Sequence, residues 1–417
     1  GRGLAVMLDV VYNHMGPDGN YLGVYHGGYF SARHKTPWGD GLNFEEPAVR
    51  EFFAENAPYW RREFHIDGFR LDATHAMEDS SERHILAEIS DRVHASGAFL
   101  VAEDERNEPE VLRPVEAGGL GFNGVWSDDF HHVVRVMLTG QREGYYVNFQ
   151  GSSDELAETL EHGWLFRGER KREDGEQRGG ESIDFPPEQF VYCISNHDQV
   201  GNRAFGERLG HLIEPAAYRA ASALICLVPY TPMLFMGQEW SASSPFQFFT
   251  DHNPELGKLV TQGRRKEFRH FAAFRDPEVL QTIPDPQAES TFANSKLRWD
   301  EIVDTPRAQM LELHREFLRV RKTHPAFRDR SRENWRVAQV ADRIVAILFG
   351  RRSTTPCLLL IDLIGGHAAP DVGKAAAQLS GDSGGAWELF LSSDDARFGG
   401  SGASPFTAPT TALYERR

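Results

Sequence analysis

The 417-residue sequence has few cysteines, and they are far apart. Cys193, Cys226 and Cys357 form no C-x-x-C pair, which excludes a disulfide framework and a thiolate zinc site. Without disulfides to protect, the chain fits a reducing compartment, and we expect it in the cytoplasm. The 39 glycines and 22 prolines fall well below the roughly 25–30% that marks low-complexity chains. The sequence therefore predicts a folded protein with a sizeable core.

Positive charge and long apolar runs are also scarce. The formal net charge is −16, which repels phosphate backbones and anionic lipid surfaces, so we expect neither nucleic acid nor membrane as a partner. The longest uncharged stretch covers 220–237, and Pro229 and Pro232 interrupt it. It predicts a buried helix that ends near Val228 and a short strand over Met233–Met236 rather than a membrane span. No oligomeric state is predicted.

Short apolar runs alternate with longer helical patterns, which is typical of a parallel α/β sheet or barrel. The expected strands are Leu4–Val10, Gly68–Asp72, Phe99–Glu103, Gly124–Ser127, Phe190–Ser195 and Met233–Met236. Amphipathic spacing predicts helices over Pro47–Phe64, Ser81–Ala95, Leu156–Leu160 and Arg307–Lys322. Ser152 and Glu155 form a plausible capping box before the third of these helices.

The pattern of apolar and small residues changes after Pro325. Three further runs, Val337–Leu348, Cys357–Ile361 and Trp387–Leu391, read as strands separated by small residues and proline. Residues Gly365–Gly385 read as an irregular loop. We therefore expect a catalytic (β/α) barrel over 1–325 and a C-terminal β-sandwich-like domain over 326–417.

Acidic residues stand at or near the ends of most predicted strands. In a closed barrel, the carboxyl ends of all strands meet at one mouth, so these acids are expected to converge. The period-two alternation of a strand turns Arg70 and Asp72 to the same side, where the guanidinium favours an ionised carboxylate. Glu103 follows an apolar run, and desolvation raises the pKa of such a carboxyl toward that of a proton donor. The strand-end acids are Asp9, Asp72, Glu103, Asp128, Asp129, Asp198 and Glu239.

One ionised and one protonated carboxyl group is the arrangement that glycoside hydrolysis needs. Two alternatives remain open: the acids could cap the helices that follow them, or they could hold a divalent metal. The neighbouring amides and histidines, in Asn13-His14 and in 196–199, favour a neutral polyol substrate instead. His131 and His132 are read as hydroxyl contacts rather than as a metal pair. The glycines of 119–124 match G-x-G-x-x-G but lack the flanking strand and helix of a dinucleotide site.

Four motifs, in order, resemble those of the α-amylase superfamily, glycoside hydrolase family 13. They are Asp9–His14, Gly68–His75, Val101–Glu103 and Asn196–Asp198. The resemblance implies that Asp72 is the nucleophile, Glu103 the acid/base and Asp198 the transition-state stabiliser, with no metal and no cofactor. The candidate substrate-binding residues are Asn13, His14, Arg70, His75, Asp129, Phe130, His131, His132, His197, Gln199 and Asn202.

Within the superfamily, several stretches are most similar to members that release trehalose from a maltooligosyl chain. They are Gly16–Leu22, Asp128–His132, Phe190–Gly210, Phe248–Pro254 and Gly263–Phe268. The expected reaction is cleavage of the α-1,4-glucosidic bond next to the terminal trehalose of maltooligosyltrehalose or a related α-1,4-glucan. Glycogen branching enzymes are the nearest alternative, and there a glutamate is expected where Gln199 stands. A non-catalytic barrel that binds sugar or a partner protein is the alternative from another class.

The resemblance also implies a TIM (β/α)8-type barrel whose third strand ends in the Asp9 motif. We therefore expect this chain to be N-terminally truncated, without the first two βα units and the N-terminal β-domain of the superfamily. A barrel without two strands has unpaired edges, so poor folding or aggregation of the isolated chain is expected.

Overall fold

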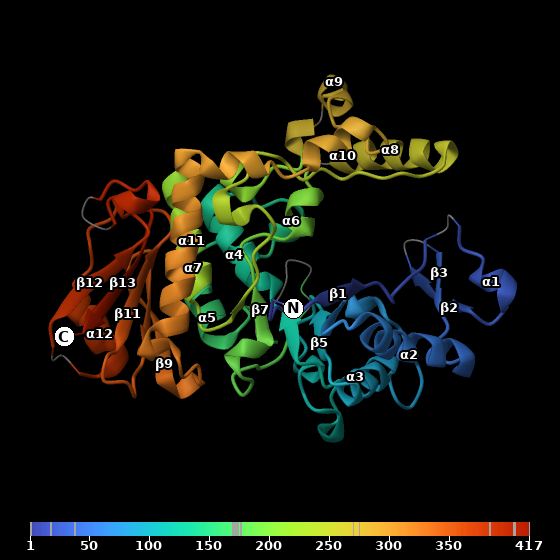
Figure 1. Cartoon of the computed structure of the whole chain (residues 1–417), viewed down its shortest axis with the longest axis horizontal. Coiled ribbons are helices and arrows are strands. Elements are labelled where there is room, and N and C mark those ends of the chain that lie inside the picture. Colours follow the sequence, from blue (N-terminus) through green and yellow to red (C-terminus); the bar gives the residue numbers. More distant parts are fainter. Residues whose placement is uncertain are drawn as a thin grey trace. The chain divides into compact units, whose positions relative to one another are not determined.

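The computed structural model describes residues 2–16, 19–36, 39–168, 175, 177–269, 271–274, 276–382, 385–402 and 406–416. The chain divides into two compact units. The first comprises 1–128 and 166–191, and the second comprises 129–165 and 192–417. This division differs from the predicted boundary between 325 and 326, and that domain boundary stays a prediction. Figure 1 labels the helices and strands along the chain.

The first unit is built on a parallel sheet in the order β1-β4-β5-β6-β7. Asp9 lies opposite Arg70, which lies opposite Val101, and Glu103 lies opposite Trp126. This register brings the carboxyl ends of neighbouring strands to the same edge. The strands are β1 (Met7–Val10), β4 (Gly68–Leu71), β5 (Phe99–Glu103), β6 (Gly124–Trp126) and β7 (Phe190–Tyr192), whose last residue belongs to the second unit.

Helices α2 (Pro47–Phe64) and α3 (Ile85–Ala95) pack against each other in this unit. Helix α3 begins four residues later than predicted because Asp79 accepts hydrogen bonds from the amides of Ser81 and Ile85 and keeps 79–84 outside the helix. A short helix and a hairpin that we did not predict complete the unit. They are α1 (Leu22–Tyr25), β2 (Phe30–Thr36) and β3 (Gly39–Leu42).

The second unit contains most of the helices. Its sixth predicted strand, Met233–Met236, is wrong: β8 covers only Thr231–Pro232, and the amide of Met233 donates to the carbonyl of Tyr192 (2.7 Å). The chain turns here, because the amide of Gln238 donates to the carbonyl of Phe235 (2.8 Å), and Arg208 donates to the carbonyl of Met236 (2.7 Å). The helices are α4 (Asp128–Thr139, whose first residue lies in the first unit), α5 (Ser153–His162), α6 (His197–Gly201), α7 (Pro215–Leu227), α8 (Pro254–Phe268), α9 (Pro277–Gln281), α10 (Glu289–Ser295) and α11 (Thr305–Thr323).

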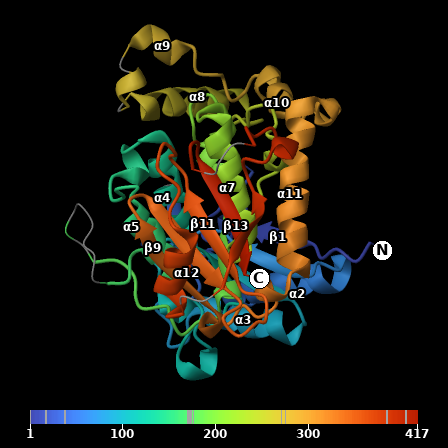
Figure 2. The same cartoon turned by 90° about the vertical axis from the view of Figure 1, so that its left-hand side faces the viewer.

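The C-terminal part of the second unit is one antiparallel sheet in the order β12-β13-β11-β10-β9. Helix α12 (Val372–Ser380) covers one face (Figure 2), and the hydroxyl of Thr411 on the other face donates to the carbonyl of Ala220 in α7 (2.9 Å). Among the residues that the structure describes, helices cover this sheet and a second sheet does not. This arrangement differs from the expected β-sandwich-like domain. The strands are β9 (Trp335–Ala341), β10 (Ile344–Phe349), β11 (Cys357–Asp362), β12 (Trp387–Ser392) and β13 (Thr410–Arg416).

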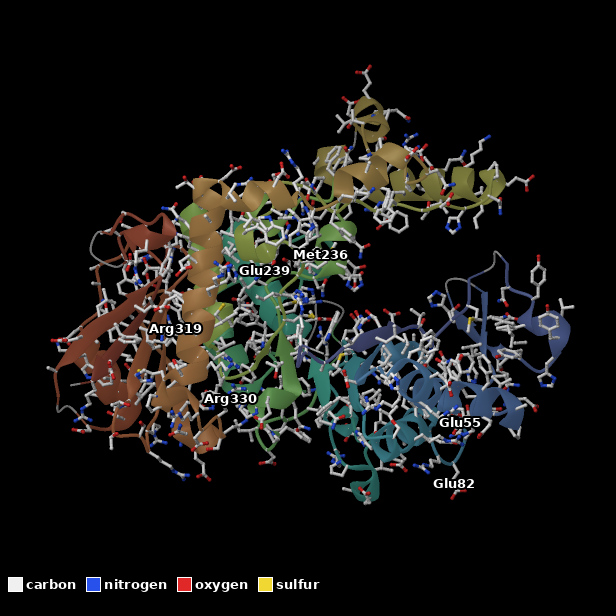
Figure 3. All side chains as sticks on the ribbon, in the orientation of Figure 1. Glu55, Glu82, Met236, Glu239, Arg319 and Arg330 are labelled. Atoms are coloured by element: carbon white, nitrogen blue, oxygen red, sulfur yellow. The ribbon has the colours of Figure 1, made fainter. Side chains whose placement is uncertain are left out.

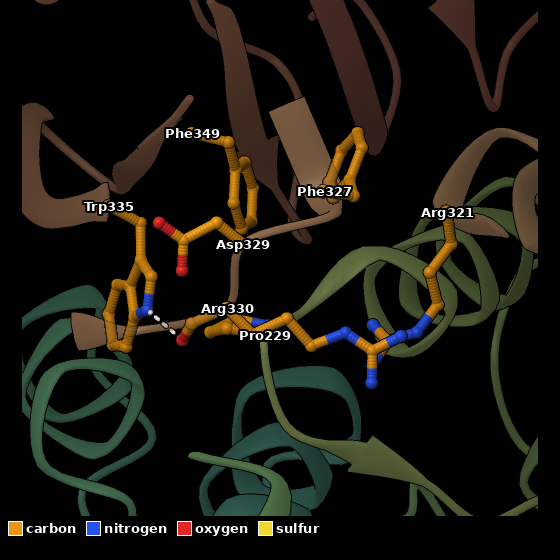
Figure 4. Close-up of a pocket in the computed structure, with 7 residues that line it drawn as sticks. All are labelled: Pro229, Arg321, Phe327, Asp329, Arg330, Trp335 and Phe349. Atoms are coloured by element: carbon orange, nitrogen blue, oxygen red, sulfur yellow. Dashed lines mark hydrogen bonds between the residues drawn. The ribbon is translucent and has the colours of Figure 1, made fainter. Parts of the chain in front are cut away.

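A small pocket lies beside the C-terminal end of α11 (Figure 4). Arg321 is buried there and donates to the carbonyls of Val228 and Tyr230, the second at 2.6 Å. These bonds attach α11 to the chain that leaves α7, so the buried guanidinium has a structural role. The pocket is lined by Pro229, Arg321, Phe327, Asp329, Arg330, Trp335 and Phe349.

Within the described ranges, none of the helices has the length and apolar character needed to cross a bilayer. All three cysteines are buried, and none of them forms a disulfide.

Candidate active site

Arg70 gathers three carboxylates in the first unit. Its side chain is buried, only 4% exposed, and its Nη1 lies 2.7 Å from Asp9 Oδ1 and 2.9 Å from Asp72 Oδ1. Its Nη2 lies 2.6 Å from Glu103 Oε2. One guanidinium on β4 therefore forms ion pairs with acids on or just after three adjacent strands, β1, β4 and β5. The same guanidinium stacks over the Trp126 ring, with its carbon 4.2 Å from the ring centroid.

Asp72 is held from two sides. Its Oδ1 accepts from Arg70, and its Oδ2 accepts from Asn13 Nδ2 (2.9 Å), which also donates to the Asp72 carbonyl (2.8 Å). His14 is hydrogen-bonded to the amide oxygen of Asn13. Burial lowers the pKa of His14, although the nearby Asp72 charge opposes this shift. The imidazole is therefore mainly neutral near pH 7, and one ring nitrogen donates while the other accepts.

Glu103 has the electrostatics of a proton donor. Burial, the largest effect, raises its pKa to about 7. The charge of Arg70 and a hydrogen bond from the amide of Ala73 (3.0 Å) oppose this rise, whereas the charges of Asp128 and Asp72 add to it. The predicted pKa increase of Glu103 is thus confirmed. Near neutral pH, a substantial fraction of this carboxyl is protonated, as a general acid requires.

A strained turn after β4 orients Glu103. Ala73 has φ 41° and ψ 56°, the left-handed region that residues other than glycine rarely adopt. This conformation brings its amide to Glu103 Oε2, and the next residue, Thr74, donates to the Glu103 carbonyl (3.0 Å) and to Asp104 (2.9 Å). The roles of Ala73 and Thr74 were missed, because side-chain type does not reveal an unusual φ at an alanine. His75 follows in the same turn.

Four predicted substrate-binding residues lie consecutively on α4 in the second unit, and all are buried. Asp129 accepts from the amide of Leu165 (2.8 Å), and Phe130 stacks on Tyr192 at 4.3 Å between centroids. The rings of His131 and His132 meet edge to face at 4.4 Å. These contacts lie within the fold, and the substrate role of the four residues stays a prediction.

The short helix α6 and Asn202, the residue after it, contain the other predicted substrate-binding residues of this unit. Asn196 caps it by accepting from the amide of Gln199 (2.9 Å). His197 Nε2 lies 3.6 Å from Asp198 Oδ2, and Asn202 donates to Asp198 Oδ1 (3.3 Å). About two fifths of the Asp198 and His197 side chains is exposed, so both are accessible to a ligand.

Gln199 accepts from the hydroxyl of Tyr146 (2.8 Å). The contact of Tyr146 with Gln199 was not predicted from the sequence. The predicted strand-end acid Glu239 (Figure 3) accepts from the amide of Gly237 (2.9 Å) and so stabilises its own turn.

The structure thus brings Asn13, His14, Arg70, Asp72 and Glu103 together in the first unit, and His197, Asp198, Gln199 and Asn202 together in the second. The convergence of Asp198 with Asp72 and Glu103 on one substrate stays a prediction.

The chain is similar to several malto-oligosyltrehalose trehalohydrolases. The protein from Deinococcus radiodurans is 48% identical over 338 residues, which cover 80% of this chain and 54% of that protein. The protein from Saccharolobus solfataricus is 42% identical over 326 residues, which cover 77% of this chain and 55% of that protein. The chain therefore spans just over half the length of these curated relatives. No family model matches the chain.

A crystal structure of a Salmonella typhimurium protein assigned as an α-amylase superimposes with a TM-score of 0.84 at 33% identity. The match covers 100% of this chain and 68% of that protein. It confirms the predicted fold class, a parallel sheet of the TIM-barrel type followed by a C-terminal β-domain. The chain belongs to the α-amylase family, and its aligned part is homologous to malto-oligosyltrehalose trehalohydrolases.

Proposed function

We propose that the protein is a retaining glycosidase that cuts the α-1,4-glucosidic bond next to the terminal trehalose of maltooligosyltrehalose. The products are trehalose and a shorter maltooligosaccharide. The observation that carries the proposal is the pair of carboxyl groups that lie against Arg70. The Asp72 carboxylate is fixed by hydrogen-bond donors, and the pKa of Glu103 is raised to about 7. Homology to trehalohydrolases supports the choice of substrate.

In the proposed reaction, Asp72 attacks the anomeric carbon of the glucosyl unit while Glu103 protonates the leaving oxygen. The Asp72–glucosyl ester forms as the bond to trehalose breaks. Glu103, now ionised, then takes a proton from water, and the water oxygen displaces Asp72. Each step inverts the anomeric carbon, so the α configuration is retained.

The residues around the two acids support these roles. Arg70 and Asn13 hold the Asp72 carboxylate in a fixed orientation, which reduces the freedom lost on attack. Arg70 also balances the charge that Glu103 acquires when it gives up its proton. Asp198, with His197 beside it, would bind glucosyl hydroxyls more tightly in the transition state. The three buried cysteines form no disulfide, which fits a cytoplasmic enzyme.

The test compares two substrates in parallel with the protein. Maltooligosyltrehalose should give trehalose, whereas a plain maltooligosaccharide of the same length should give little product. Formation of α-1,6 branches would indicate a branching enzyme instead, and saturable α-glucan binding without any product would indicate a non-catalytic barrel. The variant D72N serves as the inactive control. A parallel assay with a chelator tests the metal-dependent alternative, because a metal-dependent enzyme would lose its activity in the chelator.

A further inference from the structure

Tyr146 links two segments of the second unit that were both predicted to bind substrate. It lies at the end of a single-turn helix, Gly144–Tyr146, in the connection between α4 and α5. Its hydroxyl donates to Gln199 Oε1 on α6 (2.8 Å). Its ring meets the His132 ring of α4 nearly at right angles, with 5.5 Å between centroids. The tyrosine is therefore in contact with both predicted substrate-binding segments.

Two arginines, of which Arg135 is buried, hold the start of the connection that carries Tyr146. Gln141 Oε1 accepts from Arg135 Nε (3.2 Å) and Nη2 (3.1 Å), and also from Arg203 Nη1 (3.4 Å). Arg135 on α4 is only 1% exposed, so its position is closely defined. The start of the connection is thus attached both to α4 and to the segment that follows α6. Burial raises the pKa of Tyr146, so its hydroxyl remains a proton donor at any working pH.

The hydrogen bond from Tyr146 decides which end of the Gln199 amide is left for a ligand. A glutamine side chain has one oxygen that accepts and one nitrogen that donates, and the two exchange places when the amide rotates by half a turn. Here the oxygen is bound to Tyr146, and the backbone amide of Gln199 is bound to Asn196. Nε2 has no hydrogen-bond partner among the residues that the structure describes. Its two N–H groups are available beside Asp198.

We propose that Tyr146 is a positioning residue that fixes Gln199 as a hydrogen-bond donor to a hydroxyl oxygen of the α-glucan bound beside Asp198. The inference rests on the proposed function for its substrate. A glutamate at this position would still accept from Tyr146 but would offer oxygen instead of N–H to the sugar. The pair formed by Tyr146 and Gln199 therefore sets the direction of this hydrogen bond: Gln199 donates and the substrate hydroxyl accepts.

The test is a double-mutant cycle with Y146F, Q199A and the double variant, measured as kcat and KM for trehalose release. Y146F removes only the hydroxyl and keeps the ring on His132. Each single variant should lower kcat/KM about tenfold, the size expected for one net hydrogen bond, and the double variant should be no worse than Q199A. The control Y59F removes a hydroxyl from a tyrosine that is 44% exposed on α2 and should leave kcat/KM unchanged.

An unchanged kcat/KM in Y146F would overturn the proposal. Losses in kcat/KM that multiply in the double variant would also overturn it, because a role of Tyr146 in packing alone does not depend on residue 199. If Y146F fails to fold, Q199N, whose amide is one methylene too short for the Tyr146 hydroxyl, should show the tenfold loss, and full activity would overturn the proposal. If the unmodified protein releases no trehalose, the proposed function fails. The same cycle, measured as the Kd for maltohexaose, then decides the role of Tyr146 by the same criterion.

Discussion

At the scale of single residues, the account depends on how opposing effects set the protonation of Glu103. Burial and the charges of Asp128 and Asp72 raise its pKa, while Arg70 and the Ala73 amide lower it. The result of about 7 keeps the proton available for the leaving oxygen and still lets the carboxylate serve as a base in the second step. The amide of Ala73 reaches Glu103 only because the backbone of Ala73 adopts a strained conformation, which is energetically unfavourable.

This electrostatic balance predicts the pH dependence of the first step. Glu103 is protonated below its pKa and ionised above it, so kcat/KM should fall tenfold per pH unit above about pH 7. E103Q should lose about 10²–10⁴ in kcat/KM on the natural substrate. With an α-glucosyl fluoride, whose leaving group needs no proton, E103Q should retain rapid formation of the glycosyl-enzyme. A rate independent of pH up to 9, or full activity of E103Q on the natural substrate, would contradict the role of Glu103.

Sequence reasoning at this scale succeeded where a strand sets the geometry. Period-two alternation correctly put Arg70 beside Asp72, and the apolar run before Glu103 correctly indicated a raised pKa. It could not find Ala73 or Tyr146. An unusual φ at alanine and a contact from a connection 53 residues away in sequence both depend on tertiary structure.

At the scale of elements, helices with strong end signals were predicted well. Helix α2 begins at Pro47 and ends at Phe64, as expected from its apolar spacing, and the structure places Pro47 in its first turn. The predicted loop Gly365–Gly385 is wrong, because α12 lies within it and packs small alanines on the sheet. Alanine gives a weak periodic signal, so the pattern lacked large residues to reveal the helix. The last strand, β13, was missed because it follows a stretch rich in small residues.

The N-terminal cap of α5 gives a test at this scale. The Ser152 hydroxyl accepts from the amide of Glu155 (3.1 Å), and Glu155 in turn accepts from the amides of Gln150 and Gly151, both at 2.8 Å. S152A should therefore lower the free energy of unfolding by about 1 kcal/mol, measured by urea denaturation. S80A, at an exposed serine outside any helix, should change it by less than about 0.5 kcal/mol. Equal values for the two variants would show that the cap is not needed.

At the scale of the whole molecule, all three cysteines report on the integrity of the core. They are buried, and burial raises the pKa of Cys226 and Cys357 to about 12. Cys357 Sγ lies 3.6 Å from His324 Nε2, but Nε2 also lies 3.4 Å from Glu415 Oε1, and Nδ1 accepts from the amide of Ala326 (3.2 Å). Both ring nitrogens of His324 therefore have partners other than the thiol.

The native protein should therefore react with none of its thiols when treated with an aromatic disulfide reagent at pH 8, and with all three after unfolding in denaturant. Reducing agents should leave the Tm unchanged, because no disulfide is present to break. Rapid reaction of even one thiol in the absence of denaturant would show that the core around it opens locally.

The central claim is that Asp72 and Glu103 carry out a retaining hydrolysis that releases trehalose. The most direct measurement follows the reaction of maltooligosyltrehalose with the full-length protein by proton NMR from the first minutes. The account predicts free trehalose together with a new reducing end that appears first as the α anomer and then equilibrates. A new reducing end that appears first as the β anomer, or consumption of substrate without trehalose, would contradict it.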